Sequence, residues 1–180
     1  MNNVDFAPVV VFAYNRVEHL ERTLVTLSAN FLAKESDLII FSDASKNEND
    51  LRSVTAVRSF LKEFQCTKFF KSVEIVEATE NKGLAHSIIT GVTIIINKYK
   101  KIIVVEDDVV TSPYFLRYMN DALICYKDCP RIGSVASIVP NIEIPANYEH
   151  SVFVSMRPSS WSWATWIDRW ETSDWEMKDY

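Results

Sequence analysis

The chain has 180 residues and a mass of 20.7 kDa; 48% of its residues are hydrophobic and 24% are charged, and its net charge is −5. This composition is typical of one globular domain with a sizeable core, and it excludes disordered, collagen-like and disulfide-stapled chains. The acidic balance gives no support to nucleic-acid binding, which usually needs a basic face. The 3 cysteines show no C-x-x-C spacing, which favours reduced thiols over a disulfide framework or a zinc knuckle.

The sequence shows no targeting segment and no membrane span. Residues 1–6 do not form a basic region followed by an apolar stretch, so no signal peptide is predicted. The densest apolar segment runs only over 88–96, whereas a membrane span needs about 18 apolar residues. We therefore expect a cytoplasmic protein, with association at the inner face of the membrane left open.

Strand and helix patterns alternate along most of the chain. Apolar, β-branched runs predict buried strands at 8–14, 38–41, 73–76 and 101–105. Apolar residues at helical spacing predict helices at about 15–27, 50–64, 84–99 and 111–126. Four strand-then-helix units in succession predict an α/β fold of three layers (α/β/α), in which a mainly parallel sheet is covered by helices on both faces.

Two of the predicted helices carry start signals. Asn15, with Glu18 three residues later, matches a capping box. Thr111 and Ser112 precede Pro113, which is the order of a hydroxyl cap and a proline in the first helical turn. We therefore expect these helices to begin at these residues.

The pattern changes in the last third of the chain. A short strand is predicted at 132–137 and a further one at 152–155, with a loop-like stretch between them. All 5 tryptophans come after residue 160. Trp163, Trp166 and Trp170 fall at i, i+3 and i+7, which fits a packing stripe on a helix or a platform that stacks on sugars.

Polar side chains come directly after each of the first four predicted strands. Ligands of open α/β sheets bind beyond the carboxyl ends of the strands, so these side chains are the first candidates for a site. They are Asn15, Arg16, Ser42, Asp43, Asn81, Lys82 and the triplet Glu106-Asp107-Asp108.

The acidic triplet gives the sharpest chemical signal. Three adjacent carboxylates repel one another, and a divalent cation would relieve that repulsion. Carboxylate oxygens suit hard ions such as Mg²⁺ and Mn²⁺, and Mg²⁺ often takes only one or two carboxylates together with substrate phosphates. The alternative is a solvated strand end whose acids lie near a helix N-terminus. Similarly, Asp43 and Lys82 are also common turn residues, and His86 fits a half-exposed helix position.

The sequence excludes several other α/β enzymes. With only 3 glycines, the chain has neither the G-x-G-x-x-G fingerprint of dinucleotide-binding folds nor a P-loop. It also lacks the G-x-S-x-G elbow of serine hydrolases.

Five ordered motifs carry a resemblance that covers about residues 7–175. The runs PVVVFAYNR, LIIFSDAS, ENKGLA and IIVVEDDVVTSPYFLRYM resemble the nucleotide-sugar-binding half of GT-A glycosyltransferases. The nearest likeness is to bacterial family 2-type enzymes and to the N-acetylglucosaminyltransferase I group, whose metal motif is also Glu-Asp-Asp. The run SSWSWATWIDRW resembles a signature of bacterial members, in which glycine often stands where this chain has Ser162.

The resemblance implies a GT-A fold and a metal-dependent transfer of a sugar from a nucleotide-diphosphate donor, expected to be a UDP-sugar. In it, Asp43 would recognise the base and Asp108 would bind Mn²⁺ or Mg²⁺. Asp107 would approach the ribose or the sugar, and Glu106 would support the site through hydrogen bonds. The other residues implied to bind the donor are Ala13, Tyr14, Asn15, Arg16, Lys82 and His86.

The resemblance also implies a division of the chain and an acceptor. Within a single domain over 1–180, the donor half would cover about 7–137 and an acceptor half would begin at about 138–180, truncated at its C-terminus. Asp168 and Asp174 are the candidates for the catalytic base, unless that base lies beyond the chain, and Trp161 and Trp163 are the candidates for the acceptor site. We expect inverting transfer to a glycan or lipid-linked saccharide in bacterial surface-polysaccharide synthesis.

Three alternatives compete with this interpretation. A sugar-phosphate nucleotidyltransferase needs a glycine-rich, arginine-containing loop after the first strand, and here Arg16 is present without glycine. A receiver domain places its acidic cluster after the first strand, whereas here it comes after the fourth. A truncated donor-binding domain without turnover fits the same residues.

Overall fold

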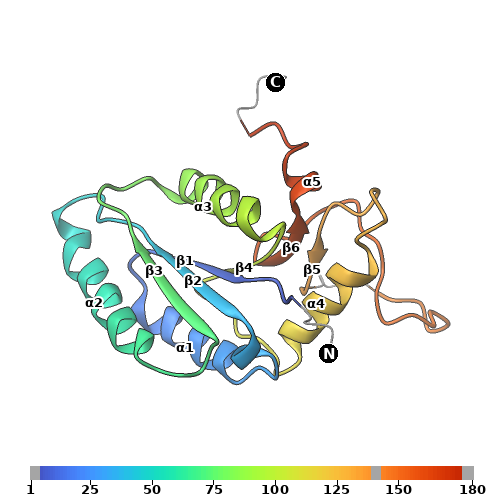
Figure 1. The fold of residues 1–180 in the computed structure, drawn as a ribbon, viewed down its shortest axis with the longest axis horizontal. Helices are drawn as coiled ribbons and strands as arrows, with labels where there is room; N and C mark the ends of the chain where they lie inside the picture. The colour runs from blue at the N-terminus through green and yellow to red at the C-terminus, as the bar shows by residue number, and fades with distance from the viewer. Residues whose placement is uncertain (1–4, 139–142, 176–180) are drawn as a thin grey trace.

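The computed structural model describes residues 5–138 and 143–175, and its core is one six-stranded sheet with the strand order β3-β2-β1-β4-β6-β5 (Figure 1). Four of these strands are parallel, as the sequence predicts. They are β1 (Val9–Ala13), β2 (Asp37–Ser42), β3 (Ser72–Glu77) and β4 (Lys101–Glu106). The helices that come after them are α1 (Val17–Ser28), α2 (Glu48–Gln65), α3 (Leu84–Tyr99) and α4 (Phe115–Cys125). A short 3₁₀ turn (Ala33–Glu35) joins α1 to β2. The α/β fold with a mainly parallel sheet is confirmed.

Helices cover both faces of the sheet, which gives the three layers (Figure 1). Successive side chains of a strand point to opposite faces, so each central strand contributes side chains to the hydrophobic cores on both faces of the sheet. Val9 and Val11 of β1 pack with α1, α2 and α4 on one face. Val10 and Phe12 pack with α3 on the other face. The central strands β1 and β4 are buried on both faces, which explains their unbroken apolar sequences.

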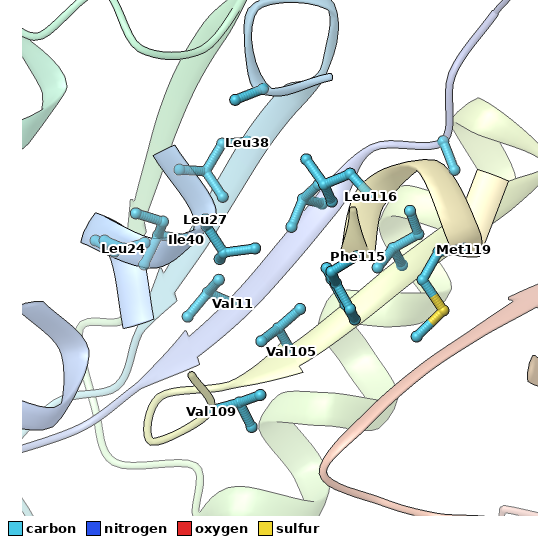
Figure 2. Packing of buried hydrophobic residues seen from close by; sticks show 14 of the residues in the cluster. Val11, Leu24, Leu27, Leu38, Ile40, Val105, Val109, Phe115, Leu116 and Met119 are labelled. Atoms are coloured by element: carbon cyan, nitrogen blue, oxygen red, sulfur yellow. The ribbon is translucent and has the colours of Figure 1, made fainter. Parts of the chain in front are cut away.

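The larger core lies between the sheet and the helices α1, α2 and α4 (Figure 2). Leu24 and Leu27 of α1 meet Ile40 of β2, while Met119 of α4 packs on the side of Val105. All five side chains are fully buried. Because burying one such side chain contributes about 1.5–3 kcal/mol, this core fixes the strand ends that carry the polar residues.

The last two strands run against the direction of the first four. β6 (Ser162–Trp166) lies between β4 and β5 (Val135–Ala136) and is antiparallel to both. The predicted strand at 132–137 is therefore shortened to two residues, and β6 was not predicted. The short helix α5 (Ile167–Trp170) comes directly after β6.

The tryptophan spacing does not reflect a helix. Trp163 and Trp166 both belong to β6 and point to opposite faces of the sheet, since they are three residues apart in a strand. Trp163 stacks on Trp170 on the α3 face, with ring centroids 5.8 Å apart. Trp166 is buried on the other face, where its indole N–H donates to the Leu123 carbonyl at 3.0 Å. The residues pack, but not as one helical stripe.

The predicted helix starts and the predicted strand at 152–155 need correction. α1 begins at Val17 without a side-chain cap, because the Asn15 amide is directed to Asp50 instead. α4 begins at Phe115, and no side chain caps it. Residues 152–155 are exposed and pair with no strand, so the strand predicted there does not form.

None of the helices within 5–138 and 143–175 combines the length and the apolar character that crossing a membrane requires.

Candidate functional site

A cavity of about 550 Å³ opens where the parallel strands β1, β2, β3 and β4 end. Its volume lies in the range of small-molecule sites. The loops after β1, β2 and β3 contribute most of its walls, the start of α3 forms one side, and Asp107 after β4 closes another. The carboxyl edge of the parallel strands is therefore hollowed, as expected of a ligand site in an open α/β sheet.

The floor of the cavity is aromatic. Phe12 and Phe41, on adjacent strands, stack with ring centroids 5.3 Å apart and an interplanar angle of 14°. Gly91 of α3 lies directly over this pair: a Cβ at that position would be 2.8 Å from Cε1 of Phe12. Glycine is needed for α3 to lie this close to the sheet. Phe12 is buried and Phe41 partly buried, and together they make this end of the cavity apolar.

Asp43 lines the cavity, and its carboxylate organises the loop that leads into α3. The exposed fraction of Asp43 is 9%, and its two oxygens accept hydrogen bonds from the chain itself. The donors are the backbone N–H groups of Ala44 (2.9 Å), Lys82 (3.0 Å) and Gly83 (3.0 Å), the Asn81 amide (3.2 Å) and, at 3.5 Å, the Ser87 hydroxyl. A carboxylate has about four lone-pair sites, and all are used here. Direct contact of Asp43 with a base stays a prediction.

The carboxylate of Asp43 lies against the turn that leads into α3. Gly83 adopts φ 72°, in the left-handed region that favours glycine, and turns the chain into α3. Asp43 accepts from the N–H groups of Lys82 and Gly83, the two residues that precede this helix. The cationic side chains among the residues that line the cavity are Arg16, Lys46 and Lys82.

Lys82 and His86, which follow β3 and were both expected to lie along the nucleotide, differ in their position relative to the cavity. Lys82 is exposed and lines the cavity. His86 is exposed on the first turn of α3 and is not among the residues that line the cavity. The structure therefore brings Lys82 to the site and leaves His86 outside it.

The loop after β1 lines the cavity from Ala13 to Arg16. It is tied to the start of α2. The Tyr14 hydroxyl donates to Asp50 at 2.9 Å and accepts from the Lys46 N–H at 3.1 Å. The Asn15 amide donates to the other oxygen of Asp50 at 3.4 Å. Two neighbouring loops of the site are thus fixed to each other.

Arg58 supports the site from α2, and no local sequence pattern points to it. Its guanidinium donates to the carbonyl of Ala78 at 2.7 Å and to that of Asp43 at 3.4 Å, and it pairs with Glu77 at 3.4 Å. These contacts join the ends of β2 and β3. Arg58 stands within an amphipathic helix pattern, where an arginine is ordinarily solvated, so only the fold shows its role.

Arg16 pairs with the acidic triplet. One guanidinium nitrogen contacts Asp107, and the other is 3.0 Å from an oxygen of Asp108. Asp107 is buried, whereas the side chains of Asp108 and Arg16 are 37% and 46% exposed. The Thr23 hydroxyl donates to the backbone carbonyl of Asp107 at 2.9 Å, which fixes the turn after β4 to α1.

The triplet is electrostatically crowded. Burial raises the pKa of Glu106, and the charges of Asp108 and Asp107 raise it further. Burial also raises the pKa of Asp107, although the hydrogen bond and the charge of Arg16 oppose this shift. Among the hydrogen bonds of the described residues none involves the Glu106 carboxylate, and support of the site by Glu106 through hydrogen bonds stays a prediction. The Glu106 N–H donates to the Trp161 carbonyl at 3.1 Å.

The donor set fits a divalent cation of the Mg²⁺ or Mn²⁺ type. Asp107, which lines the cavity, and its neighbour Asp108, which does not, both offer hard carboxylate oxygens, and they already hold the guanidinium of Arg16 between them. Among the residues described, no group of three or more His, Cys, Asp and Glu forms a complete cage. A cation here would therefore take its remaining ligands from water or from a bound phosphate, which is common for Mg²⁺.

The candidate base Asp168 lies far from the triplet. β6 is antiparallel to β4, so Trp166 pairs with Lys101 at the opposite end of β4 from Glu106. Asp168 lies just beyond Trp166, and its ion pair with Arg169 lowers its pKa. The five steps of β4 span about 16 Å, so Asp168 does not reach the acids. This position does not favour Asp168 as a base at the triplet, and its catalytic role stays a prediction. Asp174, in the turn after α5, remains a prediction.

The two candidates for the acceptor site, Trp161 and Trp163, differ in exposure. Trp161 is 58% exposed and is held beside Glu106 by the hydrogen bond between their backbones. Trp163 is partly buried and packs with Trp170 in the smaller core. Of the two, only Trp161 is placed to meet a ligand at the triplet.

No protein-family model and no curated protein sequence matches the chain. Solved structures are similar in fold. The mannosyltransferase PcManGT from Pyrobaculum calidifontis, in complex with GDP-Man and Mn²⁺, superposes with a TM-score of 0.51 at 17% identity, over 76% of this chain and 36% of that one. TarS from S. aureus gives a TM-score of 0.51 at 14% identity, over 68% of this chain and 20% of that one. The chain thus spans about a third or less of the length of these structures, and it has a GT-A-like glycosyltransferase fold.

Proposed function

We propose that this chain binds the nucleotide-sugar donor of a metal-dependent glycosyltransferase that transfers the sugar to a hydroxyl group of a saccharide acceptor. The observation that carries the proposal is the cavity at the carboxyl edge of the parallel strands, which has an aromatic floor and is lined on one side by the buried Asp107, with the partly exposed Asp108 next to it in sequence. The similarity in fold to a mannosyltransferase in complex with GDP-Man and Mn²⁺ supports it.

Each part of the cavity would take one part of the donor. The Phe12–Phe41 floor suits the nucleobase, since aromatic faces pack on flat rings. Lys46 and Lys82 at the rim carry charge for the diphosphate. Asp108, with Asp107 beside it, would hold the Mn²⁺ or Mg²⁺ ion. That ion would stabilise the negative charge that develops on the departing nucleoside diphosphate.

Trp161 completes this proposal on the acceptor side. Its exposed indole beside Glu106 suits stacking on a pyranose, either of the donor sugar or of the acceptor. Inverting chemistry, a saccharide or lipid-linked acceptor, and a role in bacterial surface polysaccharide remain part of the proposal on the resemblance of the motifs alone.

A second hypothesis, donor binding without turnover, is favoured by the position of Asp168. In an inverting transfer a carboxylate has to take the proton of the attacking hydroxyl. Asp168, one of the two candidates for this task, lies at the opposite end of β4. Measuring donor hydrolysis and transfer separately from donor binding distinguishes the two hypotheses.

Calorimetric titration tests the proposal. UDP is the first nucleotide to titrate, with and without Mn²⁺, and GDP the second, because the mannosyltransferase complex contains GDP-Man. We expect metal-dependent binding of one of them, and its loss in Asp108→Asn. Asp121→Asn is the matched control, because it removes an exposed carboxylate of α4 that pairs only with Arg117 among the ion pairs of the described residues. No binding of either nucleotide to the folded chain would contradict the proposal.

A further inference from the structure

The guanidinium of Arg16 bridges two carboxylates, which a simple surface ion pair does not do. Arg16 uses two different nitrogens on two different carboxylates, one buried (Asp107) and one at the surface (Asp108). The hydrogen bond to Asp107, followed by the charges of both acids, raises the pKa of Arg16. The guanidinium therefore takes up carboxylate oxygens that a cation would need.

Arg16 is also the only described cation that forms an ion pair with the triplet. Without it, three adjacent acids would stand at the end of β4 with no positive partner among the residues that the structure describes. With it, one positive charge offsets part of the repulsion. A guanidinium is always protonated, so the positive charge of Arg16 itself does not depend on pH.

The side chain of Arg16 contacts the acids but is otherwise half-exposed. It immediately precedes α1, and its side chain is 46% exposed. It lines the same cavity as Lys46 and Lys82, so its charge can reach either the acids or an anion bound in the cavity. Asp107, in contrast, is fixed: its side chain is buried, and the Thr23 hydroxyl donates to its backbone carbonyl.

We propose that Arg16 is a displaceable internal counter-ion of Asp107 and Asp108, which competes with the divalent cation and moves to the diphosphate when cation and nucleotide bind together. The inference rests on the proposed function, because it assumes that a cation binds at these acids. It predicts that the cation alone binds weakly, since it has to displace Arg16 from Asp108 without offering it a new partner. A nucleoside diphosphate offers that partner, so the two ligands should bind cooperatively.

Titration with Mn²⁺ alone, followed by calorimetry or by the electron paramagnetic resonance signal of free Mn²⁺, tests the competition. Arg16→Gln should bind Mn²⁺ about tenfold more tightly than the original chain, which is within the usual range of couplings between sites. Arg22→Gln is the matched control, because Arg22 is an exposed arginine of α1 without an ion pair among those found in the described residues. Adding Asp108→Asn to Arg16→Gln should abolish the gain.

Cooperativity gives an independent measurement. In the original chain, UDP or GDP should increase the affinity for Mn²⁺ many-fold, and Arg16→Gln should reduce that increase to less than half. Arg16→Lys should be intermediate, because an ammonium keeps the charge but does not bridge two carboxylates with a fixed fork. A thermal melt in Mn²⁺ and in EDTA monitors folding: the rise in midpoint caused by Mn²⁺ should be larger for Arg16→Gln than for the original chain.

The outcomes separate the inference from the function on which it rests. Unchanged affinity of Arg16→Gln for Mn²⁺, with nucleotide binding still metal-dependent, overturns the counter-ion role and leaves the proposed function standing. Nucleotide binding that needs no metal, with no Mn²⁺ bound by any variant, overturns the counter-ion role and the metal site together, and leaves only the nucleotide cavity.

Discussion

The parallel and antiparallel halves of the sheet differ in where they place the residues at their strand ends. β1, β2, β3 and β4 all end at the same edge, so the side chains after them converge on one cavity. β6 runs the other way beside β4, and its C-terminal neighbour α5, with Asp168, lies at the opposite edge. Trp161, which precedes β6, accepts a backbone hydrogen bond from Glu106 of the acidic triplet. Strand direction therefore decides which residues of each half can act at the site.

The largest effect tests the structural role of the antiparallel half. Trp166→Ala should lower the free energy of unfolding by about 3–5 kcal/mol, because it empties a buried site and leaves the carbonyl of Leu123 without its donor. Trp161→Ala, in the same half but exposed, should change it by less than about 0.5 kcal/mol. Urea denaturation of both variants measures this. Equal losses of unfolding free energy in the two variants would mean that the burial of Trp166 in β6 does not stabilise this half.

The next effect tests the parallel half. Asp43→Ala should cost about 2–3 kcal/mol in stability, because it leaves partly buried N–H groups of the loop before α3 unpaired. Nucleotide binding should fall strongly with it, since the same loop lines the cavity. Asp43→Asn is the sharper variant, because it keeps the size of the side chain but has one acceptor oxygen. Urea denaturation and calorimetry report the two effects, and tight binding by a destabilised Asp43→Ala would separate this loop from the site.

A smaller effect tests the cavity floor. Gly91→Ala places a methyl group 2.8 Å from the ring of Phe12, and overpacking of this kind costs about 1–3 kcal/mol. The gain in helix propensity of about 1 kcal/mol opposes it, which leaves a net loss of about 1 kcal/mol. Nucleotide binding should weaken, because the stacked rings have to shift. Gly133→Ala is the control, since nothing lies within 4 Å of its added Cβ; an equal loss there would contradict the packing argument.

The smallest effect is expected at the opposite edge. Asp168→Asn removes an exposed carboxylate paired with its neighbour Arg169, and such pairs contribute about 0–1 kcal/mol. Nucleotide affinity and the dependence on Mn²⁺ should both stay close to those of the original chain. Calorimetry of this variant beside Asp108→Asn compares the two ends of β4 directly. A large loss of binding in Asp168→Asn would show that α5 communicates with the site.

Local patterns were sufficient for the parallel half. The bounds predicted for α3 agree with the structure, because its apolar residues recur at helical spacing and Gly83 marks its start. The four buried strands are continuous apolar runs, and their alternation with helices allows few arrangements other than a parallel sheet. The convergence of Asn15, Arg16, Asp43 and Lys82 on one cavity results from that topology.

The antiparallel half and the side-chain partners required the fold. The spacing of Trp163, Trp166 and Trp170 fits a helix, and β6 is specified instead by its pairing with β4, which lies far earlier in the chain. Asn15 has the sequence of a cap, but in the structure its amide N–H donates to Asp50, and no side chain caps α1. The contacts of Arg58 and of Arg16 join residues that are distant in sequence, and no local pattern encodes such contacts.

The pairing of β1 with β4 also bears on how the chain folds. Arg16 and Asp107 are separated by 91 positions in sequence, and they meet only because β1 and β4 lie side by side. Closing so long a loop is entropically unfavourable until both strands are in place, and topologies rich in such contacts fold slowly. A collapsed intermediate that has formed only the β1-α1-β2 unit therefore carries no cation site. Time-resolved Mn²⁺ binding during refolding would mark the moment at which the central strands join.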